Sequence, residues 1–568
     1  MTDSVISKIF VRAFRASFGQ ASVCVARPWL VFTILFAVDK LALSLKPSVE
    51  LGPLCRILVV SSAWSALVCS PYLLLGRWAR RVYLPLAVLL LASDIVQWHV
   101  VSNFGILLSG FWMSLVLGTS PAEIKAYVES FVSLKTCLLL ACGLGVVGFL
   151  CVFLRPFELR ARRVALLFFC GMALGGVGFF AARNPRDLAA PVDFVKSNLA
   201  CGLFVVDTID QIPRMTAMFR IQGHPVVGGS PRPSPSAAPV GVFVLGESAT
   251  RNRWSLYGYG RPTTPAMEAV ANELVAFSNL VGVASTTCET MRLLLSEATI
   301  DDPVDMRCTL PQALAKAGFE CVLLTAQGRM GMWRVLDGAT KNMFDGFETL
   351  MFGGCSRLRF MADEQQSPYW YDDVLPEALA QELSRPCARP RVFFVHLLGS
   401  HFPPVNFVPP DFAPFPHESP EGEGQNDPSR NVNNYDNTIA FTDQVLGRLV
   451  GMLKARGGSS WMLYVSDHGE SVDSPCFRLP SDPSVWEIPM VFWASDAYKD
   501  AHAELMAKAR ESTDAPLQSD LLFATILRIC GVEGYESARP ETSFESAPFG
   551  FRKVRKICEG AKVYESRR

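Results

Sequence analysis

Long apolar blocks fill the first 190 residues of the chain, whereas the rest alternates short apolar runs with amphipathic stretches. Each long block has roughly the 20 residues that a helix needs to cross a membrane. The pattern predicts five membrane-spanning helices, near residues 28–46, 57–75, 83–101, 134–154 and 164–182. An amphipathic segment at the membrane surface is expected near 103–133. Together these features predict an α-helical membrane domain over residues 1–183.

Basic residues are concentrated in every second segment outside the predicted spans. They precede the first span and lie between spans two and three and between spans four and five, as Lys8, Arg12, Arg15, Arg27, Arg77, Arg80, Arg81, Arg155, Arg160, Arg162 and Arg163. Because basic loops stay on the cytoplasmic side, this alternation predicts a cytoplasmic N-terminus. Everything after residue 183 is then outside. No convincing cleavage site is present, so no removable signal peptide is expected.

A Pro-, Gly- and Ser-rich segment, GGSPRPSPSAAP at 228–239, separates two parts of different character. Such a composition is typical of a linker, and residues 184–238 are expected to form bridging helices followed by this linker. Residues 1–190 contain 18 Lys and Arg against 8 Asp and Glu, which leaves 35 against 45 for the remainder. The net charge of zero is therefore the sum of a basic part and an acidic part.

Short apolar runs recur through residues 239–568, the second predicted domain. They are VGVFVLG (240–246), CVLLTA (321–326), RVFFVHLLG (391–399), SWMLYVSD (460–467) and IPMVFWAS (488–495). Helical stretches such as LPQALAKAG and YDNTIAFTDQVLGRLVGMLKA lie between them. Strands that alternate with helices predict an α/β domain with a mostly parallel sheet covered by helices on both faces. The polar tract 405–433 is expected to be a long surface loop.

Acidic and imidazole side chains follow several of these predicted strands. Glu247 follows the first, His396 and His401 accompany the third, and Asp467 and His468 follow the fourth. Ligands of such sheets bind beyond the carboxyl ends of the strands. Carboxylate oxygen and imidazole nitrogen are zinc donors, and a catalytic zinc keeps one position open. The pattern predicts zinc held by Glu247, Asp467 and His468, although each residue alone is also typical of a loop.

A hydroxyl-rich segment, VASTTCETMR at 283–292, is the candidate source of a nucleophile. Its hydroxyl-bearing residues are Ser285, Thr286, Thr287 and Thr290. A threonine hydroxyl is a poor nucleophile at neutral pH, and coordination to zinc would lower its pKa. Most threonine-rich turns have only a structural role. The segment is therefore a candidate nucleophile only in combination with the acidic and imidazole residues at the other strand ends.

Four motifs, GESATRNRWSLYGYGRPTTP, HLLGSH, YDNTIAFTD and YVSDHGES, resemble those of the phosphoethanolamine transferases of Gram-negative inner membranes, which belong to the alkaline phosphatase and sulfatase superfamily. The resemblance covers most of the chain, since that family also has five spans before a periplasmic domain. It implies a bacterial inner-membrane, multi-pass protein with a periplasmic catalytic domain and no nucleic-acid partner, and we expect a monomer.

The resemblance also implies roles for individual residues. Glu247, Asp467 and His468 match the zinc ligands, and Thr287 matches the nucleophile, with Thr286 as the alternative one residue away. His396 and His401 match histidines that hold the phosphoryl group or a second metal. The stretch GTSPAEIKAY resembles a segment that contacts the lipid donor, which places Thr119 and Glu123 there. These last two are equally typical of a helix N-cap and first-turn acid.

The implied reaction moves phosphoethanolamine from phosphatidylethanolamine to a lipopolysaccharide phosphate through a covalent phosphothreonine. The acceptor is either lipid A or a core sugar, and the sequence does not choose between them. Two departures from the family are visible: Val283 and Leu293 replace cysteines that often form a disulfide, and no histidine occurs between His468 and His502. One zinc site is expected, and the missing histidine argues against a second of the usual form.

Other functions remain open from the sequence. Cys288 and Arg292 have the spacing of a sulfatase nucleophile motif, but Thr290 stands at its proline position. A glycerol-phosphate transferase or polymerase of the lipoteichoic acid synthase type shares five spans and the Glu, Thr and Asp-His positions, but not the SLYGYGRPTTP signature. A hydrolytic phosphatase and a catalytically degenerate, membrane-anchored binding module are the remaining alternatives.

Overall fold

The computed structural model describes most of the second predicted domain. The described residues are 239–303, 308–327, 352–361, 371–416, 428–473, 482–532, 540–559 and 562–566, with three isolated helical positions at 137, 141 and 145. The five predicted spans, apart from those three positions, lie outside the described residues, as do the segment near 103–133 and the linker. Within the described residues, no helix has both the length and the apolar character needed to span a membrane.

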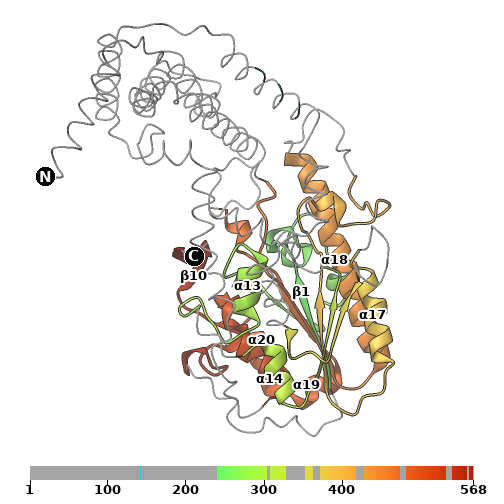
Figure 1. Cartoon of the computed structure of the whole chain (residues 1–568), viewed down its shortest axis with the longest axis vertical. Coiled ribbons are helices and arrows are strands. Elements are labelled where there is room, and N and C mark those ends of the chain that lie inside the picture. Colours follow the sequence, from blue (N-terminus) through green and yellow to red (C-terminus); the bar gives the residue numbers. More distant parts are fainter. Residues whose placement is uncertain are drawn as a thin grey trace, which may run out of the picture. The chain divides into compact units, whose positions relative to one another are not determined.

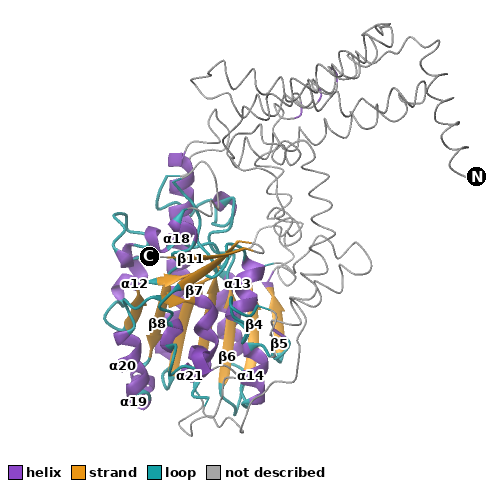
Figure 2. Ribbon diagram, turned by 90° about the vertical axis from the view of Figure 1, so that its left-hand side faces the viewer, coloured by secondary structure: helices purple, strands orange, loops and turns teal. Residues whose placement is uncertain are grey.

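A seven-stranded sheet forms the centre of the described domain, in the order β2-β8-β7-β1-β6-β4-β5 (Figure 2). Its strands are β1 Val240–Gly246, β2 Leu274–Phe277, β4 Glu320–Thr325, β5 Arg357–Phe360, β6 Arg391–His396, β7 Ser460–Ser466 and β8 Met490–Ala494. Strands β1, β4, β5, β6 and β7 run parallel, and β8 runs antiparallel to β7 and β2. The prediction of a mostly parallel sheet is confirmed.

Helices cover both faces of this sheet (Figure 1). They are α12 Pro265–Ala269, α13 Thr287–Leu294, α14 Leu310–Lys316, α17 Val374–Leu383, α18 Pro428–Arg456, α19 Asp496–Ala501, α20 Ala503–Glu511 and α21 Leu522–Ile529. Alternate residues of β1 point to opposite faces. Phe243 and Leu245 therefore join one apolar core with α13, α14, α20 and α21, whereas Val242 and Val244 join another with α12, α17 and α18.

Some elements differ from the prediction. The tract 405–433 was expected to be loop throughout, but α18 begins at Pro428. Proline is favoured in the first turn of a helix, and α18 continues along the sheet through buried residues such as Tyr435 and Ile439. Strand β5 was not predicted, because Arg357 and Arg359 occupy alternate positions of a four-residue run. These arginines form ion pairs with buried Glu382.

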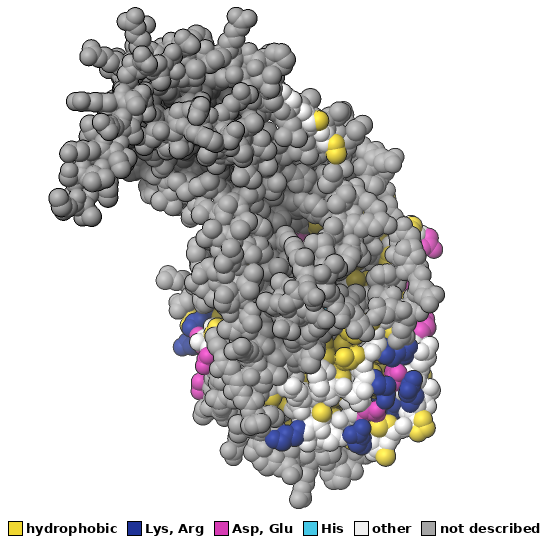
Figure 3. Space-filling view, viewed as in Figure 1, with side chains coloured by type: hydrophobic (Ala, Val, Ile, Leu, Met, Phe, Trp, Pro, Cys, Tyr) yellow, Lys and Arg dark blue, Asp and Glu magenta, His cyan; other side chains and the backbone are white. Residues whose placement is uncertain are grey.

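Smaller elements complete the described domain. Strand β3 Leu280–Val281 pairs in parallel with β9 Leu517–Gln518, and β10 Arg555–Glu559 forms an antiparallel hairpin with β11 Lys562–Ser566. Exposed charges are paired in several places; Lys454 Nζ, for example, lies 2.7 Å from Glu273 Oε1. On the face seen in Figure 3, basic and acidic side chains of described residues lie near one another around the lower part of the molecule.

Candidate active site

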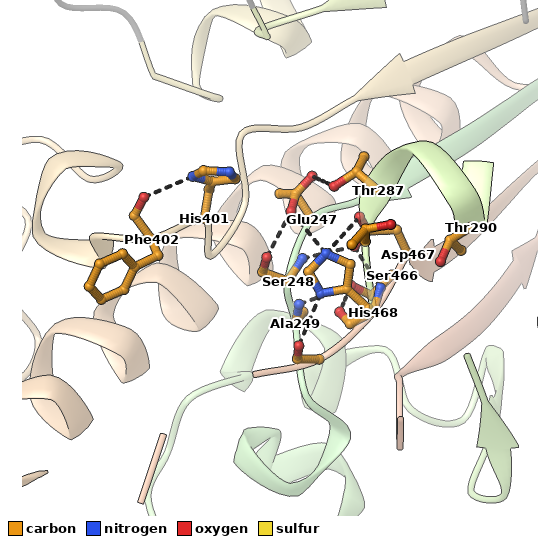
Figure 4. A network of polar contacts seen from close by, with 12 residues as sticks. Glu247, Ser248, Ala249, Thr287, Thr290, His401, Phe402, Ser466, Asp467 and His468 are labelled. Atoms are coloured by element: carbon orange, nitrogen blue, oxygen red, sulfur yellow. Dashed lines mark hydrogen bonds and ion pairs between the residues drawn. The ribbon is translucent and has the colours of Figure 1, made fainter. Parts of the chain in front are cut away.

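Three candidate metal ligands meet where two neighbouring strands end. Glu247 directly follows β1, and Asp467 and His468 directly follow β7. The two strands pair in parallel, with Gly246 opposite Ser466, so their carboxyl ends bring the three side chains together (Figure 4). One ligand atom from each of the three residues lies within 4.8 Å of the others, and all three residues are buried.

The ring of His468 is oriented to bind a cation. Its Nδ1 lies 3.0 Å from the carbonyl oxygen of Gly469, and because a carbonyl oxygen only accepts, Nδ1 carries the proton. Its Nε2 faces Asp467 Oδ2 at 3.4 Å and Glu247 Oε1 at 3.6 Å. Two carboxylates and an imidazole nitrogen that face one another in this way fit a zinc ion between them.

The carboxylate of Asp467 is held in place by backbone donors. Its Oδ1 accepts the N–H of Ser248 at 2.9 Å and the N–H of His468 at 2.6 Å. The N–H of Asp467 in turn donates to the carbonyl of Gly246 at 3.2 Å. These contacts fix the Asp-His turn against the end of β1, so the ligand geometry follows from the pairing of the two strands.

The hydroxyl of Thr287 lies beside this group of ligands. Thr287 is the first residue of α13, and its Oγ1 donates to Glu247 Oε2 at 3.0 Å. The first backbone N–H groups of a helix have no partner within the helix, and the helix dipole favours negative charge at this end. The position therefore suits a hydroxyl that becomes a nucleophile and then carries a phosphoryl group.

Thr286, the alternative nucleophile, has a different environment. It is the N-cap residue of α13, and its hydroxyl donates to Glu289 Oε2 at 3.3 Å. The Thr286 side chain makes no cap hydrogen bond to the backbone of α13. Burial raises the pKa of Glu289 to about 7, against the opposing effects of Arg292 and the Thr286 hydrogen bond. The geometry favours a structural role for Thr286 and leaves the position beside Glu247 to Thr287.

His396 is the last residue of β6, which pairs with β1 opposite β7, and His401 lies in the loop that follows. His396 ends β6, opposite Leu245 of β1 and Thr325 of β4, and its Nδ1 is 3.5 Å from the Thr325 hydroxyl. Burial lowers its pKa to about 4, while the charge of Glu247 acts in the opposite direction, so the ring is neutral near pH 7. His401 contacts the carbonyl of Phe402 through Nδ1 at 2.9 Å, and in Figure 4 it lies apart from the four clustered side chains.

The loop after β6 is fastened to Glu247 by its backbone. The N–H of Ser400 donates to the Glu247 carbonyl at 2.9 Å. Gly399 has a φ of +55°, and a Cβ there would lie 2.6 Å from the same carbonyl oxygen. Buried Asp372 accepts the N–H groups of Leu398 and Gly399 at 2.7 and 2.9 Å. The Gly of the HLLGSH motif is therefore required by the close approach of two backbone segments.

Two residues near the site were not singled out from the sequence. Gln327, just beyond β4, donates through Nε2 to Glu247 Oε2 at 3.2 Å and to the Leu397 carbonyl at 2.9 Å. Its place after an apolar run was a signal that could have identified it. Asp372 precedes α17, and an acidic residue at the start of a helix is common. The sequence therefore carries no indication of its hydrogen bonds to the loop after β6.

Four other positions singled out from the sequence make no polar contact with the described site or lie outside the described residues. Val283 and Leu293, at the two positions where the sequence resemblance implies cysteines, are buried in one apolar cluster with Ala284, Ala298 and Ile300. Apolar side chains therefore occupy the place where a disulfide between these two positions would lie. Thr119 and Glu123, the predicted lipid-contacting residues, lie outside the described residues.

Comparisons with known proteins identify the family of the described domain. The family model described as Sulfatase matches residues 239–532. Phosphoethanolamine transferase EptA of Helicobacter pylori is 27% identical over 303 residues, covering 51% of this chain and 53% of that protein. Phosphoethanolamine transferase EptC of Escherichia coli is 29% identical over 278 residues, covering 46% of each protein. The chain thus spans about half the length of these two relatives.

A solved structure extends the comparison beyond the described domain. The integral membrane protein lipooligosaccharide phosphoethanolamine transferase A (EptA) from Neisseria meningitidis matches with a TM-score of 0.66 and 20% identity, over 92% of this chain and 97% of that one. At this identity the likeness concerns the fold alone.

Proposed function

The chain belongs to the sulfatase family, and we propose that it transfers phosphoethanolamine from phosphatidylethanolamine to a lipopolysaccharide phosphate, on lipid A or on a core sugar. Relatives over the matched half of the chain carry the name phosphoethanolamine transferase. The observation that carries the proposal is the Thr287 hydroxyl, 3.0 Å from Glu247 Oε2 and beside the buried group of Glu247, Asp467 and His468.

The first half-reaction loads the enzyme. Thr287 Oγ1 attacks the phosphorus of phosphatidylethanolamine; the Oγ1–P bond forms and the bond from phosphorus to the diacylglycerol oxygen breaks. The hydroxyl proton ends on the released diacylglycerol, so atoms and charges balance. Zinc held by Glu247, Asp467 and His468 would lower the pKa of the Thr287 hydroxyl and offset the charge of the phosphoryl oxygens. The N-terminal N–H groups of α13 face the same charge.

The second half-reaction passes phosphoethanolamine to the acceptor. A hydrogen-phosphate group of lipopolysaccharide attacks the phosphorus on Thr287; the new O–P bond forms and the Oγ1–P bond breaks. The proton of the acceptor phosphate ends on the released Thr287 oxygen, giving a ping-pong sequence. His396 is neutral near pH 7 because burial lowers its pKa to about 4. The neutral ring can therefore donate a hydrogen bond to a phosphoryl oxygen without adding charge. We assign His396 and His401 to holding the phosphoryl group and moving protons.

The proposed location follows from the chemistry of both substrates. Donor and acceptor are lipids, so the five predicted spans would hold the catalytic domain at the outer surface of a bacterial inner membrane. Thr119 and Glu123 would contact the lipid donor from the membrane domain. Tethering confines enzyme and substrates to one surface and raises their encounter rate. An added ethanolamine amine would offset lipopolysaccharide charge and weaken the binding of cationic peptides.

Lipid mass spectrometry tests this function. Lipopolysaccharide from cells that express the wild-type protein is expected to carry added phosphoethanolamine, and the fragment that carries it identifies lipid A or core. Cells that express Thr287→Ala serve as the control and should lack the addition. A wild-type sample without phosphoethanolamine, or with added glycerol phosphate instead, would contradict the proposal.

A further inference from the structure

The residue after Glu247 has an unusual backbone conformation. Ser248 has a φ of +55°, in the left-handed region that residues other than glycine seldom adopt. Its N–H donates to Asp467 Oδ1 at 2.9 Å, and its hydroxyl donates to Glu247 Oε1 at 2.7 Å. A strained turn therefore connects two of the three candidate zinc ligands, and such strain persists only where surrounding contacts hold it.

Tyr435 of α18 holds this turn from the other side. Its hydroxyl donates to the Ser248 carbonyl at 2.6 Å and accepts the N–H of Thr250 at 2.8 Å. The two bonds span 187 and 185 positions of the chain, and the tyrosine side chain is fully buried. Burial keeps the phenol protonated, because it raises the pKa of Tyr435 well above its usual value. A hydroxyl can donate and accept at once, which a phenylalanine cannot do.

We infer that Tyr435 is a positioning residue for the metal ligands. Its hydroxyl fixes both sides of the strained Glu247–Thr250 turn, and this turn directs the Glu247 carboxylate toward Asp467, His468 and Thr287. Without the hydroxyl, a buried carbonyl and a buried N–H lose their partner, and the turn can relax away from the left-handed conformation. The Glu247, Asp467 and His468 side chains would then become ordered only when zinc binds. The free-energy cost of this ordering lowers the affinity for zinc. The inference rests on the proposed zinc site.

The chain offers a matched control in Tyr498 of α19. It is also buried, and its hydroxyl also donates to a buried backbone carbonyl, that of Ile529, at 2.6 Å. Burial raises the pKa of Tyr498 as well. Its ring packs against Phe492 and His502, and none of these residues belongs to the candidate site. Tyr498→Phe removes one buried hydrogen bond and Tyr435→Phe removes two, but only Tyr435 contacts the turn after Glu247.

The test compares Tyr435→Phe with Tyr498→Phe in the purified full chain, with Zn²⁺ alone as the ligand. Two quantities are measured: the zinc Kd, by competition with a chromophoric chelator, and the melting temperature of the metal-free protein. Both variants should melt at reduced temperatures, Tyr435→Phe at the lower one because it loses two buried hydrogen bonds instead of one. The zinc Kd should rise about tenfold to a hundredfold in Tyr435→Phe, as for lost supports of metal ligands, and stay near the wild-type value in Tyr498→Phe.

Three results would overturn the inference. The first is a wild-type zinc Kd in Tyr435→Phe, and the second is an equal loss of affinity in Tyr498→Phe. The third is failure of Tyr435→Phe alone to fold, because the inference gives the hydroxyl a local role. If the wild-type protein binds zinc and forms the phosphothreonine, any of these contradicts the role of Tyr435 and leaves the proposed function standing. A wild-type protein that binds no zinc contradicts both.

Discussion

The hydroxyl of Thr287 donates a hydrogen bond to Oε2 of Glu247 over 3.0 Å, although 40 positions separate the two residues in the chain. The same carboxylate oxygen accepts a second hydrogen bond from Gln327 Nε2 at 3.2 Å. Helix α13 and the ends of β1 and β4 thus converge on one atom. Because of this shared contact, the orientation of the Glu247 carboxylate and that of the Thr287 hydroxyl depend on each other.

Gln327→Met tests the orientation of the Glu247 carboxylate. Methionine keeps the approximate length of the side chain but removes the amide donor, so Glu247 loses one of the contacts that direct Oε2 toward Thr287. We expect the rate of phosphothreonine formation to fall about tenfold while zinc still binds. Rapid-quench mass spectrometry measures the rate. Gln381→Met is the control, because Gln381 is exposed and contacts Arg359; an equal loss in both variants would argue against a local effect.

His468→Ala removes one of the three proposed zinc ligands. We expect its zinc Kd to rise about a hundredfold or more, since only two ligands from the chain remain. Zinc content after dialysis against a weak chelator measures the effect. His502→Ala is the control, because His502 is only partly buried and its ring centroid lies 4.3 Å from that of Tyr498, away from the candidate site. Retention of stoichiometric zinc by His468→Ala would show that the metal binds elsewhere.

Gly399→Ala tests the close approach of the loop after β6 to Glu247. Both Gly399 and Gly258 have positive φ, but an added Cβ at Gly399 would lie 2.6 Å from the Glu247 carbonyl, whereas at Gly258 it would meet nothing within 4 Å. Gly258→Ala should cost about 1 kcal/mol of unfolding free energy, and Gly399→Ala about 3 kcal/mol or more. Denaturant unfolding measures both. Equal losses would mean that backbone strain alone, rather than contact with Glu247, explains the glycine.

Asp443 makes stability depend on pH. Its carboxylate on α18 accepts the N–H groups of Ala266 and Met267 at 2.7 and 2.9 Å, and burial raises its pKa from 3.8 to about 7. Between these values the folded state retains a proton that the unfolded state has lost, so the contribution of Asp443 to stability falls as pH rises from about 4 to about 7.

Melting temperatures of the wild-type chain and of Asp443→Asn, measured from pH 4 to pH 8, check this sign. The melting temperature of the wild type minus that of Asp443→Asn should fall as pH rises, and it should become constant above about pH 8. A difference that grows in favour of the wild type with rising pH would mean that Asp443 is ionised in the folded protein throughout this range.

Much of the fold could be predicted because its central strands are continuous apolar runs with no competing signal. The run VGVFVLG, predicted as a strand over 240–246, has the bounds of β1. Strand β5 could not be found in this way, since Arg357 and Arg359 interrupt its apolar character and their ion pairs to Glu382 become visible only once α17 packs beside it.

The candidate site shows the same division. Glu247, Asp467 and His468 could be identified because each follows an apolar run, and parallel strands end at one edge of a sheet. The sequence did not decide between Thr286 and Thr287, because only the folded chain shows that Thr287 contacts Glu247 and Thr286 contacts Glu289. The role of Tyr435 could not be predicted, because a tyrosine on an amphipathic helix is usually a core residue. Its two partners lie 185 and 187 positions away in the chain.

The most direct test of the account is a search for phosphoethanolamine on Thr287. The purified protein is incubated with zinc and phosphatidylethanolamine, acid-quenched, digested and analysed by peptide mass spectrometry. We expect a mass increase of roughly 123 Da, the covalent phosphothreonine of the proposed mechanism, on the peptide that contains residues 283–292. Fragmentation should place it on Thr287; Thr286→Ala should retain it, and Thr287→Ala should lose it. An adduct that persists in Thr287→Ala, or no adduct in a wild-type protein that holds zinc, would contradict the account.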